Sequence, residues 1–214
     1  AARAIVDAMR HEADSLEVAE AAAEFAGQGV VGFDLAGPEA GYPASAHRPA
    51  LEQAREAGLH LTIHAGEADG PASIADALDC GAERLGHGVR VVDDVAFRDG
   101  EIVDLGPIAR RVHRAGVPLE VCPSSNVHTR AVPSLRRHPA AALLAAGFAV
   151  TLNTDNRLMS RTSMTREFEI GREELGMSLD DLHKVTRLAV EAAFCDEATR
   201  SVTALRVDAG YEAA

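Results

Sequence analysis

The sequence of 214 residues contains no tryptophan, few other aromatic residues and few cysteines. Aromatic residues make up 4% of a chain that is 47% hydrophobic, so we expect helices with small side chains to pack the core rather than a sandwich of aromatic strands. The three cysteines are widely scattered without a CxxC pair, which argues against a disulfide framework and favours a reducing, cytoplasmic setting. No apolar run reaches about 18 residues and no signal peptide is visible, so no membrane contact is expected.

Basic residues are also scarce. The chain has 21 Lys and Arg against 33 Asp and Glu, a net charge of -12. Binding to a phosphate backbone needs clustered positive charge, so the sequence predicts no nucleic-acid partner and a solvated acidic surface. Nothing resembles a linker, and residues 1–214 are predicted to form a single domain.

Short apolar runs alternate with longer amphipathic ones, and a glycine often separates a helix from the next strand. Repeated strand–helix–strand units predict an α/β fold with a parallel sheet, either a doubly wound open sheet or a (β/α)8 barrel. The predicted strands are 2–9, 29–37, 59–64, 82–88, 117–123 and 147–154. The predicted helices are 15–27, 45–58, 71–81, 102–116, one near 138–147, and most of the chain after 154.

Polar residues capable of metal or acid–base chemistry recur at the carboxyl ends of these predicted strands. In a parallel sheet those ends share one edge, and in a barrel they converge on one mouth. Such a repeated placement is hard to obtain from a purely structural sequence, and it indicates an active site. The residues are Asp34, His64 with Glu67, His87, Cys122 with Ser124 and Ser125, and Asp155 with Asn156.

Each of these residues also has a structural interpretation. Asp34 can bond to a turn, Cys122 can lie in the core, and Asp155 can cap the helix that follows it. Ser125 is equally compatible with both interpretations. Four other histidines lack partners in the pattern and are predicted to lie on the surface: His113, His128, His138 and His183.

An imidazole and a carboxylate at converging strand ends suit a divalent metal, most often zinc, with an open position for water. Bound zinc lowers the pKa of that water to about 7. His64 is therefore interpreted as a metal ligand. Glu67 is placed to shuttle a proton, and His87 to stabilise the attacking hydroxide. No P-loop, GxGxxG or HExxH pattern is present.

Five short motifs, in order and spacing, resemble the adenosine deaminase family of metal-dependent (β/α)8 hydrolases: "DLAG" (34–37), "HAGE" (64–67), "RLGHG" (84–88), "CPSSN" (122–126) and "LNTD" (152–155). The resemblance implies zinc-dependent deamination of adenosine or 2'-deoxyadenosine to the inosine nucleoside and ammonia, in purine salvage. It implies one zinc ion per subunit with His64 and Asp155 as ligands. Glu67 would protonate N1 of the purine, and His87 would orient the hydroxide. The Gly37 amide would bind N3 of the base.

Two departures from the family pattern affect these expectations. Family members carry a His-x-His pair at the end of the first barrel strand, and no such pair occurs here. The chain is therefore expected to be incomplete at its N-terminus, to contain about strands four to eight of the barrel, to expose apolar edges and to be inactive alone. In addition, Asn156 replaces a second aspartate. Its amide can still donate to N7 of the base, which leaves the exact substrate open.

Other functions stay open at this point. One is the deamination of another aminopurine, such as adenine, AMP or a modified adenine nucleoside. Another is a truncated, non-catalytic barrel that acts as a binding module. The partner expected is a small purine nucleoside. The sequence gives neither the oligomeric state nor the choice between zinc and another divalent ion.

Overall fold

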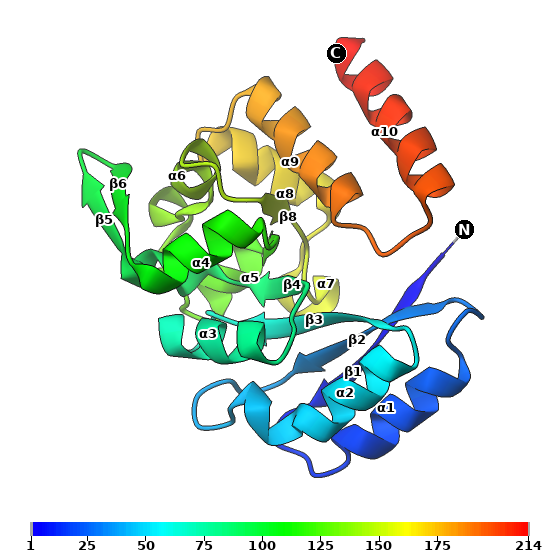
Figure 1. Ribbon diagram of the computed structural model, residues 1–214. Coiled ribbons are helices and arrows are strands. Elements are labelled where there is room, and N and C mark those ends of the chain that lie inside the picture. The colour runs from blue at the N-terminus through cyan, green and yellow to red at the C-terminus, as the bar shows by residue number, and fades with distance from the viewer. Residues whose placement is uncertain (1, 214) are drawn as a thin grey trace.

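The computed structural model describes residues 2–213. Six parallel strands form the main sheet (Figure 1). Neighbouring strands follow the order of the chain, as in a (β/α)8 barrel, whereas a doubly wound sheet reverses its order at a switch point. The α/β barrel class is thus confirmed as a partial barrel. The six strands are β1 (Ala4–Met9), β2 (Val30–Ala36), β3 (His60–Ala65), β4 (Arg84–His87), β7 (Leu119–Val121) and β8 (Val150–Leu152).

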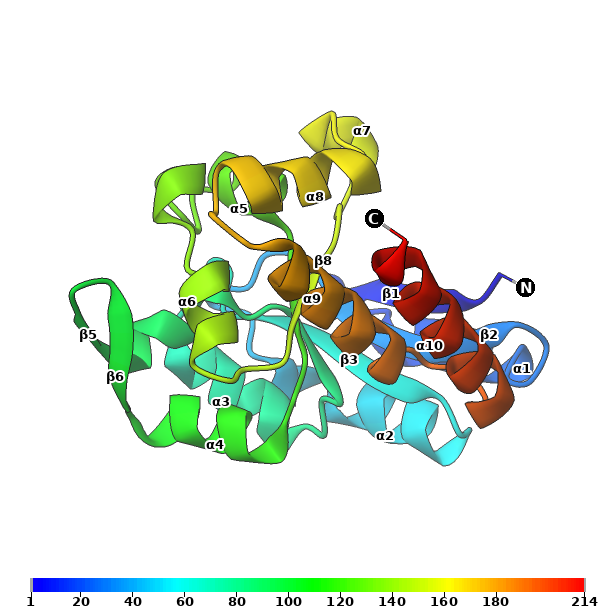
Figure 2. The same cartoon turned by 90° about the horizontal axis from the view of Figure 1, so that it is seen from above.

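Helices connect the strands and cover the outside of the sheet. Helices α1 and α2 lie side by side against β1 to β3, and α9 runs beside α10 (Figures 1 and 2). The helices are α1 (Ser15–Glu24), α2 (Arg48–Glu56), α3 (Pro71–Asp79), α4 (Pro107–Ala115), α5 (Pro123–His128), α6 (Ala140–Ala145), α7 (Arg157–Ser160), α8 (Met164–Glu173), α9 (Leu179–Glu191) and α10 (Glu197–Glu212). Short 3-10 segments occur at Ala44–His47, Val89–Asp94 and Leu135–Arg137.

The interior strands are mostly buried and rich in apolar residues, although Asp34, Thr62, Arg84 and Glu120 also lie in them. Phe33, Leu61, Ile63, Leu85 and Leu119 are all buried in one hydrophobic core. The parallel register pairs Leu85 of β4 with Leu119 of β7, so these two side chains come from adjacent strands. This core fixes the positions of the strand ends.

The first strand and the last helix are less covered. Most of β1 is exposed, including Ile5 and Met9, and α10 contains no buried residue. These exposed apolar groups agree with the open barrel edge expected from the sequence. The sheet contains all six strands predicted along the chain, one more than barrel strands four to eight would give, because β1 pairs with β2 along its whole length.

One predicted helix is shorter than expected. Residues 102–116 were predicted to be helical, but Glu101–Leu105 forms strand β6, which pairs antiparallel with β5 (Val95–Arg98). This hairpin projects from the body of the molecule (Figures 1 and 2). Helix α4 begins only at Pro107, a residue that suits the first turn because its missing N–H needs no partner there. Over residues 2–213, no helix combines the length and the apolar character that a membrane crossing requires.

The packing of β4 gives a direct test of this core. Leu85 is 0% exposed and Leu205 on α10 is 69% exposed. We expect Leu85→Ala to lower the free energy of unfolding by about 2–5 kcal/mol, because it removes buried methyl groups and leaves a cavity. The matched Leu205→Ala should change it by less than about 0.5 kcal/mol. Urea unfolding of both variants measures the difference, and equal effects would mean that β4 is not part of the core.

Candidate active site

The predicted site residues lie at the carboxyl ends of the central strands. His64 is the penultimate residue of β3, and Glu67 lies in the loop just beyond that strand. His87 ends β4, beside Ala65 in the register of the two strands. Asp155 follows β8. The parallel sheet therefore brings together four side chains that are separated by up to about ninety residues of sequence.

These four groups are close enough to act on one small molecule. Ligand atoms of Glu67, His87 and Asp155 all lie within 4.8 Å of one another. The ring centroids of His64 and His87 are 5.1 Å apart. A cavity of about 170 Å³ is lined by His64, Gly86, His87, Glu120, Cys122, Asn153 and Asp155. The predicted ligand pair His64 and Asp155 thus shares a cavity with His87.

Two of the site residues have unusual backbones. His87 and Asp155 have φ values of 65° and 51°, in the left-handed region that non-glycine residues rarely adopt. Such conformations cost on the order of 1–3 kcal/mol each and persist only where the surroundings hold them. The backbone therefore turns both side chains toward the cavity at a cost in stability, a pattern typical of functional sites.

His64 is oriented by the carboxylate of Asp34 on the neighbouring strand β2. Its Nδ1 lies 3.1 Å from Asp34 Oδ1 and 3.0 Å from Oδ2. Burial alone would lower the pKa of His64, but the charge of Asp34 and the hydrogen bond to it raise that pKa to about 9. Because Nδ1 donates to Asp34, Nε2 is the nitrogen left to bind a metal, as in carboxylate–histidine–zinc arrangements.

His87 is held from its other side by a buried pair. Its Nδ1 lies 2.9 Å from Nδ2 of Asn126, and Oδ1 of Asn126 lies 3.3 Å from Nε2 of His138. Burial lowers the pKa of His87, and the nearby carboxylate of Glu67 offsets only part of that effect. The Glu67 Oε2 atom is 3.4 Å from His87 Nε2.

The prediction that His138 lies on the surface is wrong. The residue is 7% exposed, and burial lowers its pKa to about 4. Its partner Asn126 is completely buried in α5. His128 is exposed as predicted, whereas His113 and His183 are half-buried and contact Phe148 and Tyr211.

Asp155 is anchored by Ser125 from the "CPSSN" segment. The Ser125 hydroxyl donates to Asp155 Oδ2 over 2.6 Å. Burial acts to raise the pKa of Asp155, but the hydrogen bonds from Ser125 and from the Asn156 amide help to hold that pKa below its usual value. Ser125, for which two interpretations were open, therefore supports the site directly.

The loop that carries Glu67 is fixed by the buried carboxylate of Glu39. Backbone amides of Gly66, Glu67, Ala68 and Asp69 all donate to Glu39, at 2.6, 3.0, 2.7 and 3.0 Å. Burial would raise the pKa of Glu39, yet the hydrogen bonds from Ser73 and from these amides lower it. Below the loop, the buried Arg10 guanidinium donates to the carbonyls of Leu35, Tyr42 and His64.

The two predicted base-binding residues, Gly37 and Asn156, do not line the cavity that contains His64, His87 and Asp155. Asn156 lines a neighbouring cavity of about 750 Å³ that also includes Asp155. Its Oδ1 accepts from the amides of Leu158 and Met159 and caps α7, so its NH2 group is left to donate. Gly37, with φ of 91°, follows β2 near Met9, Arg10 and His11 and lines neither cavity.

Several supporting residues were missed in the sequence, namely Arg10, Glu39, Asn126 and His138. Arg10 directly follows the predicted strand 2–9, and Glu39 and Asn126 lie just beyond two others, whereas His138 follows no predicted strand. A partial signal existed for Glu39 and Asn126, since each lies within three residues of a quoted motif or inside one. Arg10 had the same signal, since it is the first residue after the predicted strand 2–9, but no local pattern was available for His138, whose partner Asn126 is brought near by folding.

The donor set fits a metal ion. Imidazole nitrogens and carboxylate oxygens are the groups that zinc and similar ions prefer. Oε1 of Glu67 is buried without a hydrogen-bond partner among residues 2–213, although a buried carboxylate oxygen normally has one. A bound ion, water or substrate beside Glu67 would satisfy this oxygen.

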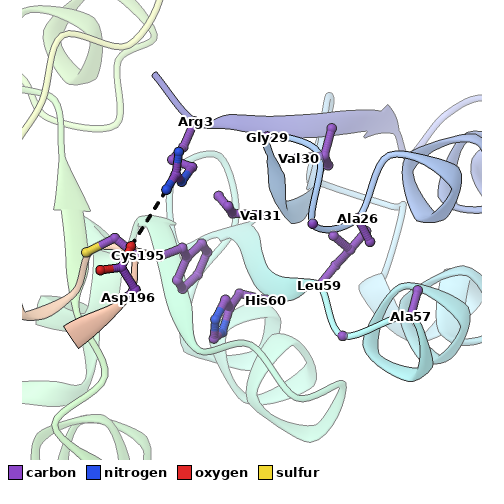
Figure 3. A pocket seen from close by; sticks show the side chains of 13 residues that line it. Arg3, Ala26, Gly29, Val30, Val31, Ala57, Leu59, His60, Cys195 and Asp196 are labelled. Carbon is purple, nitrogen blue, oxygen red and sulfur yellow. Dashed lines mark ion pairs between the residues drawn. The ribbon is translucent and has the colours of Figure 1, made fainter. Parts of the chain in front are cut away.

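A third cavity, of about 670 Å³, lies at the opposite ends of the strands (Figure 3). It is bounded by Val30, Leu59, His60 and the segment around Cys195, and Arg3 pairs with Asp196 across 3.7 Å. The His60 ring stacks on Phe194 at 4.5 Å. None of the predicted catalytic or ligand residues reaches this cavity.

The fold and the donor set define a class of protein: a partial (β/α) barrel of the type found in metal-dependent hydrolases. The adenosine deaminase family model matches residues 1–209, and the chain belongs to that family. Adenosine deaminase 1 of Streptomyces coelicolor is 50% identical over 192 residues, which are 89% of this chain and 48% of that protein. Adenosine deaminase of Mycobacterium ulcerans is 51% identical over 194 residues, 90% of this chain and 53% of the relative.

Solved structures agree with this assignment. An adenine deaminase from Arthrobacter aurescens has a TM-score of 0.86 and 28% identity, and the match covers 97% of this chain and 61% of that one. An N6-mAMP deaminase from Arabidopsis has a TM-score of 0.81 at 28% identity, with 97% and 59% covered. An amidohydrolase from Burkholderia ambifaria, solved with bound Zn, shares the fold at 21% identity and a TM-score of 0.81, with 98% and 57% covered. The chain spans about half the length of the relatives that it matches in sequence.

The Glu39 carboxylate provides a test of how the Glu67 loop is held. We expect Glu39→Gln to lower the free energy of unfolding by about 1–3 kcal/mol, because a neutral amide accepts fewer of the four N–H bonds. Amides 66–69 should then exchange with deuterium faster than in the unchanged chain. The exposed Glu56→Gln is the matched control and should alter neither quantity. Unchanged exchange at residues 66–69 in Glu39→Gln would show that another contact holds the loop.

Proposed function

We propose that the protein to which this chain belongs is a zinc-dependent adenosine deaminase, which converts adenosine and 2'-deoxyadenosine to the corresponding inosine nucleosides and ammonia. The observation that carries the proposal is the convergence of Glu67, His87 and Asp155 within 4.8 Å in a chain of this family. A binding module would have no need for a proton-transferring carboxylate at that point. The identity of about 50% with adenosine deaminases favours the nucleoside as substrate.

In this proposal His64 and Asp155 hold the metal. Nε2 of His64 is free because Asp34 takes Nδ1, and the Asp155 carboxylate is kept ionised by Ser125. Zinc, when bound, supplies a Lewis acid and a water of lowered pKa. Catalytic zinc sites usually have three protein ligands, so the two provided here would bind the ion weakly without further ligands.

The remaining residues handle protons and the purine ring. Glu67 protonates N1 as water adds to the adjacent C6, and ammonia then leaves from C6. His87 donates a hydrogen bond to the attacking oxygen. The Gly37 amide donates to N3 and the Asn156 side-chain amide donates to N7. The capping role of Asn156 supports this last assignment, since it uses Oδ1 and leaves the NH2 group for the ring nitrogen.

The second candidate is a related aminopurine such as adenine or a nucleotide. It is favoured by the fold similarity to an adenine deaminase and to an N6-mAMP deaminase, each 28% identical. We also propose a cytoplasmic location, which agrees with the free state of Cys80, Cys122 and Cys195.

The full-length parent protein, loaded with zinc, provides the test of the reaction. We expect adenosine to be converted to inosine, followed as the change in purine absorbance. Glu67→Gln should lower kcat by about 10²–10⁴-fold, because it removes the group that transfers the proton. Glu52→Gln, an exposed residue of α2, is the control and should leave kcat unchanged. No conversion of adenosine by a zinc-loaded parent that deaminates adenine or a nucleotide would assign the second candidate.

Zinc binding tests the assignment of His64 as a ligand. We expect Asp34→Asn to weaken zinc binding by the parent about 10–100-fold, because the carboxylate that orients His64 is lost. Asp99→Asn, in the exposed turn between β5 and β6, makes the same chemical change away from the site. Competition titration with a chelator measures both affinities. Equal affinities for Asp34→Asn and Asp99→Asn would contradict the proposal that Asp34 orients His64 as a metal ligand.

A further inference from the structure

The buried pair behind His87 has a consequence for the chemistry of its ring. We infer that Asn126, oriented by His138, fixes His87 in the tautomer that carries its proton on Nε2, so that His87 is a hydrogen-bond donor and not a metal ligand. Asn126 and His138 are then positioning residues for the proposed deaminase. The inference rests on the proposed function for the role of His87, but not for its tautomer.

The orientation of the Asn126 amide follows from a backbone group. The Cys122 N–H, which can only donate, lies 3.2 Å from Asn126 Oδ1. That atom must therefore be the oxygen, and the nitrogen Nδ2 must be the atom that lies 2.9 Å from His87 Nδ1. Since an amide nitrogen only donates, Nδ1 of His87 must accept, and the ring proton of neutral His87 lies on Nε2.

His138 strengthens this orientation by a similar argument. The Ala140 N–H, at the start of α6, donates to His138 Nδ1 over 3.2 Å. His138 Nε2 therefore carries the proton and donates to Asn126 Oδ1 over 3.3 Å. Two donors then converge on the Asn126 oxygen, and a flipped amide would set its NH2 group against both of them. The pKa of about 4 keeps His138 neutral, as this pattern requires.

The contact that His87 Nε2 makes with Glu67 agrees with a proton on that nitrogen. Nε2 faces Glu67 Oε2 at 3.4 Å, an acceptor suited to an N–H donor. A metal held jointly by Glu67, His87 and Asp155, which the interatomic distances would permit, needs a lone pair on that same nitrogen. The hydrogen bonds behind the ring therefore favour His64 over His87 as the histidine ligand.

Nitrogen-15 NMR of the parent protein labelled at histidine tests this inference without any measurement of activity. The His87 signals are assigned by their loss in His87→Gln. We expect Nδ1 of His87 to give the signal of an unprotonated ring nitrogen and Nε2 that of a protonated one. A protonated Nδ1 in the unchanged protein would overturn the inference whether or not the protein deaminates adenosine.

Asn126→Asp replaces the hydrogen-bond donor to His87 Nδ1 with an acceptor and hardly changes the shape of the side chain. Its carboxylate still accepts from Cys122 but now accepts from His87 as well, so we expect Nδ1 of His87 to become protonated and kcat to fall about 10²-fold. Asn153→Asp makes the same charge change at a residue that lines the cavity of His87 and donates to Val121 O and Thr151 Oγ1, and it should leave the His87 tautomer unchanged. An Nε2-protonated His87 in folded Asn126→Asp would contradict the inference.

His138 variants give a second test if Asn126→Asp does not fold. His138→Gln retains one acceptor for Ala140 and one donor for Asn126, and should keep the Nε2–H tautomer. His138→Leu retains neither, and should populate both tautomers of His87. Val132→Ala, a buried residue beside the pair, controls for loss of packing and should keep the original tautomer. Identical His87 spectra in the leucine and glutamine variants would remove His138 from the inference, whereas absent deamination with the expected spectra would count against the proposed function alone.

Discussion

The parallel alignment of six strands is the constraint on which the rest of this structure depends. Backbone pairing involves no reactive groups, yet parallel pairing in register places the carboxyl end of every strand at one edge of the sheet. His64, His87 and Asp155 meet there because β3, β4 and β8 all end at the same level. A shift of one residue along any of these strands would turn its side chains to the opposite face, and the three residues would no longer lie together.

The chemical groups of the site are positioned by other polar side chains. Each of them is held by a polar side chain from another element: Asp34 holds His64, Ser125 holds Asp155, Asn126 holds His87, and Glu39 holds the Glu67 loop. These partners are satisfied donors and acceptors, so burial does not destabilise the fold as it would for unpaired groups. The left-handed backbones of His87 and Asp155 are tolerated for the same reason, because hydrogen bonds to both side chains offset the strain.

The sequence was sufficient to predict the fold class and the groups at the strand ends. Apolar runs, helix-ending glycines and polar residues just after the strands are local patterns, and local patterns are readable from one chain. The hairpin β5–β6 was missed because the predicted helix was extended back across Gly106 and Pro107, the residues that separate "EIVDL" from α4. His138 and Arg10 were misjudged or overlooked for a different reason. Their partners, Asn126 and the carbonyls of Leu35 and His64, are brought near only by tertiary folding.

The directions of the hydrogen bonds to His64 and His87 distinguish the two rings, although the distances between the side chains do not. By distance alone, Glu67, His87 and Asp155 form the better metal group, while His64 stands slightly apart. Yet the two histidines are supported from behind by opposite chemistry, an accepting carboxylate for His64 and a donating amide for His87. An acceptor behind the ring leaves a lone pair in front of it, and a donor behind the ring leaves a proton in front. The two imidazoles, about 5 Å apart, are therefore suited to different partners. His64 is suited to a cation, and His87 to an oxygen that develops negative charge.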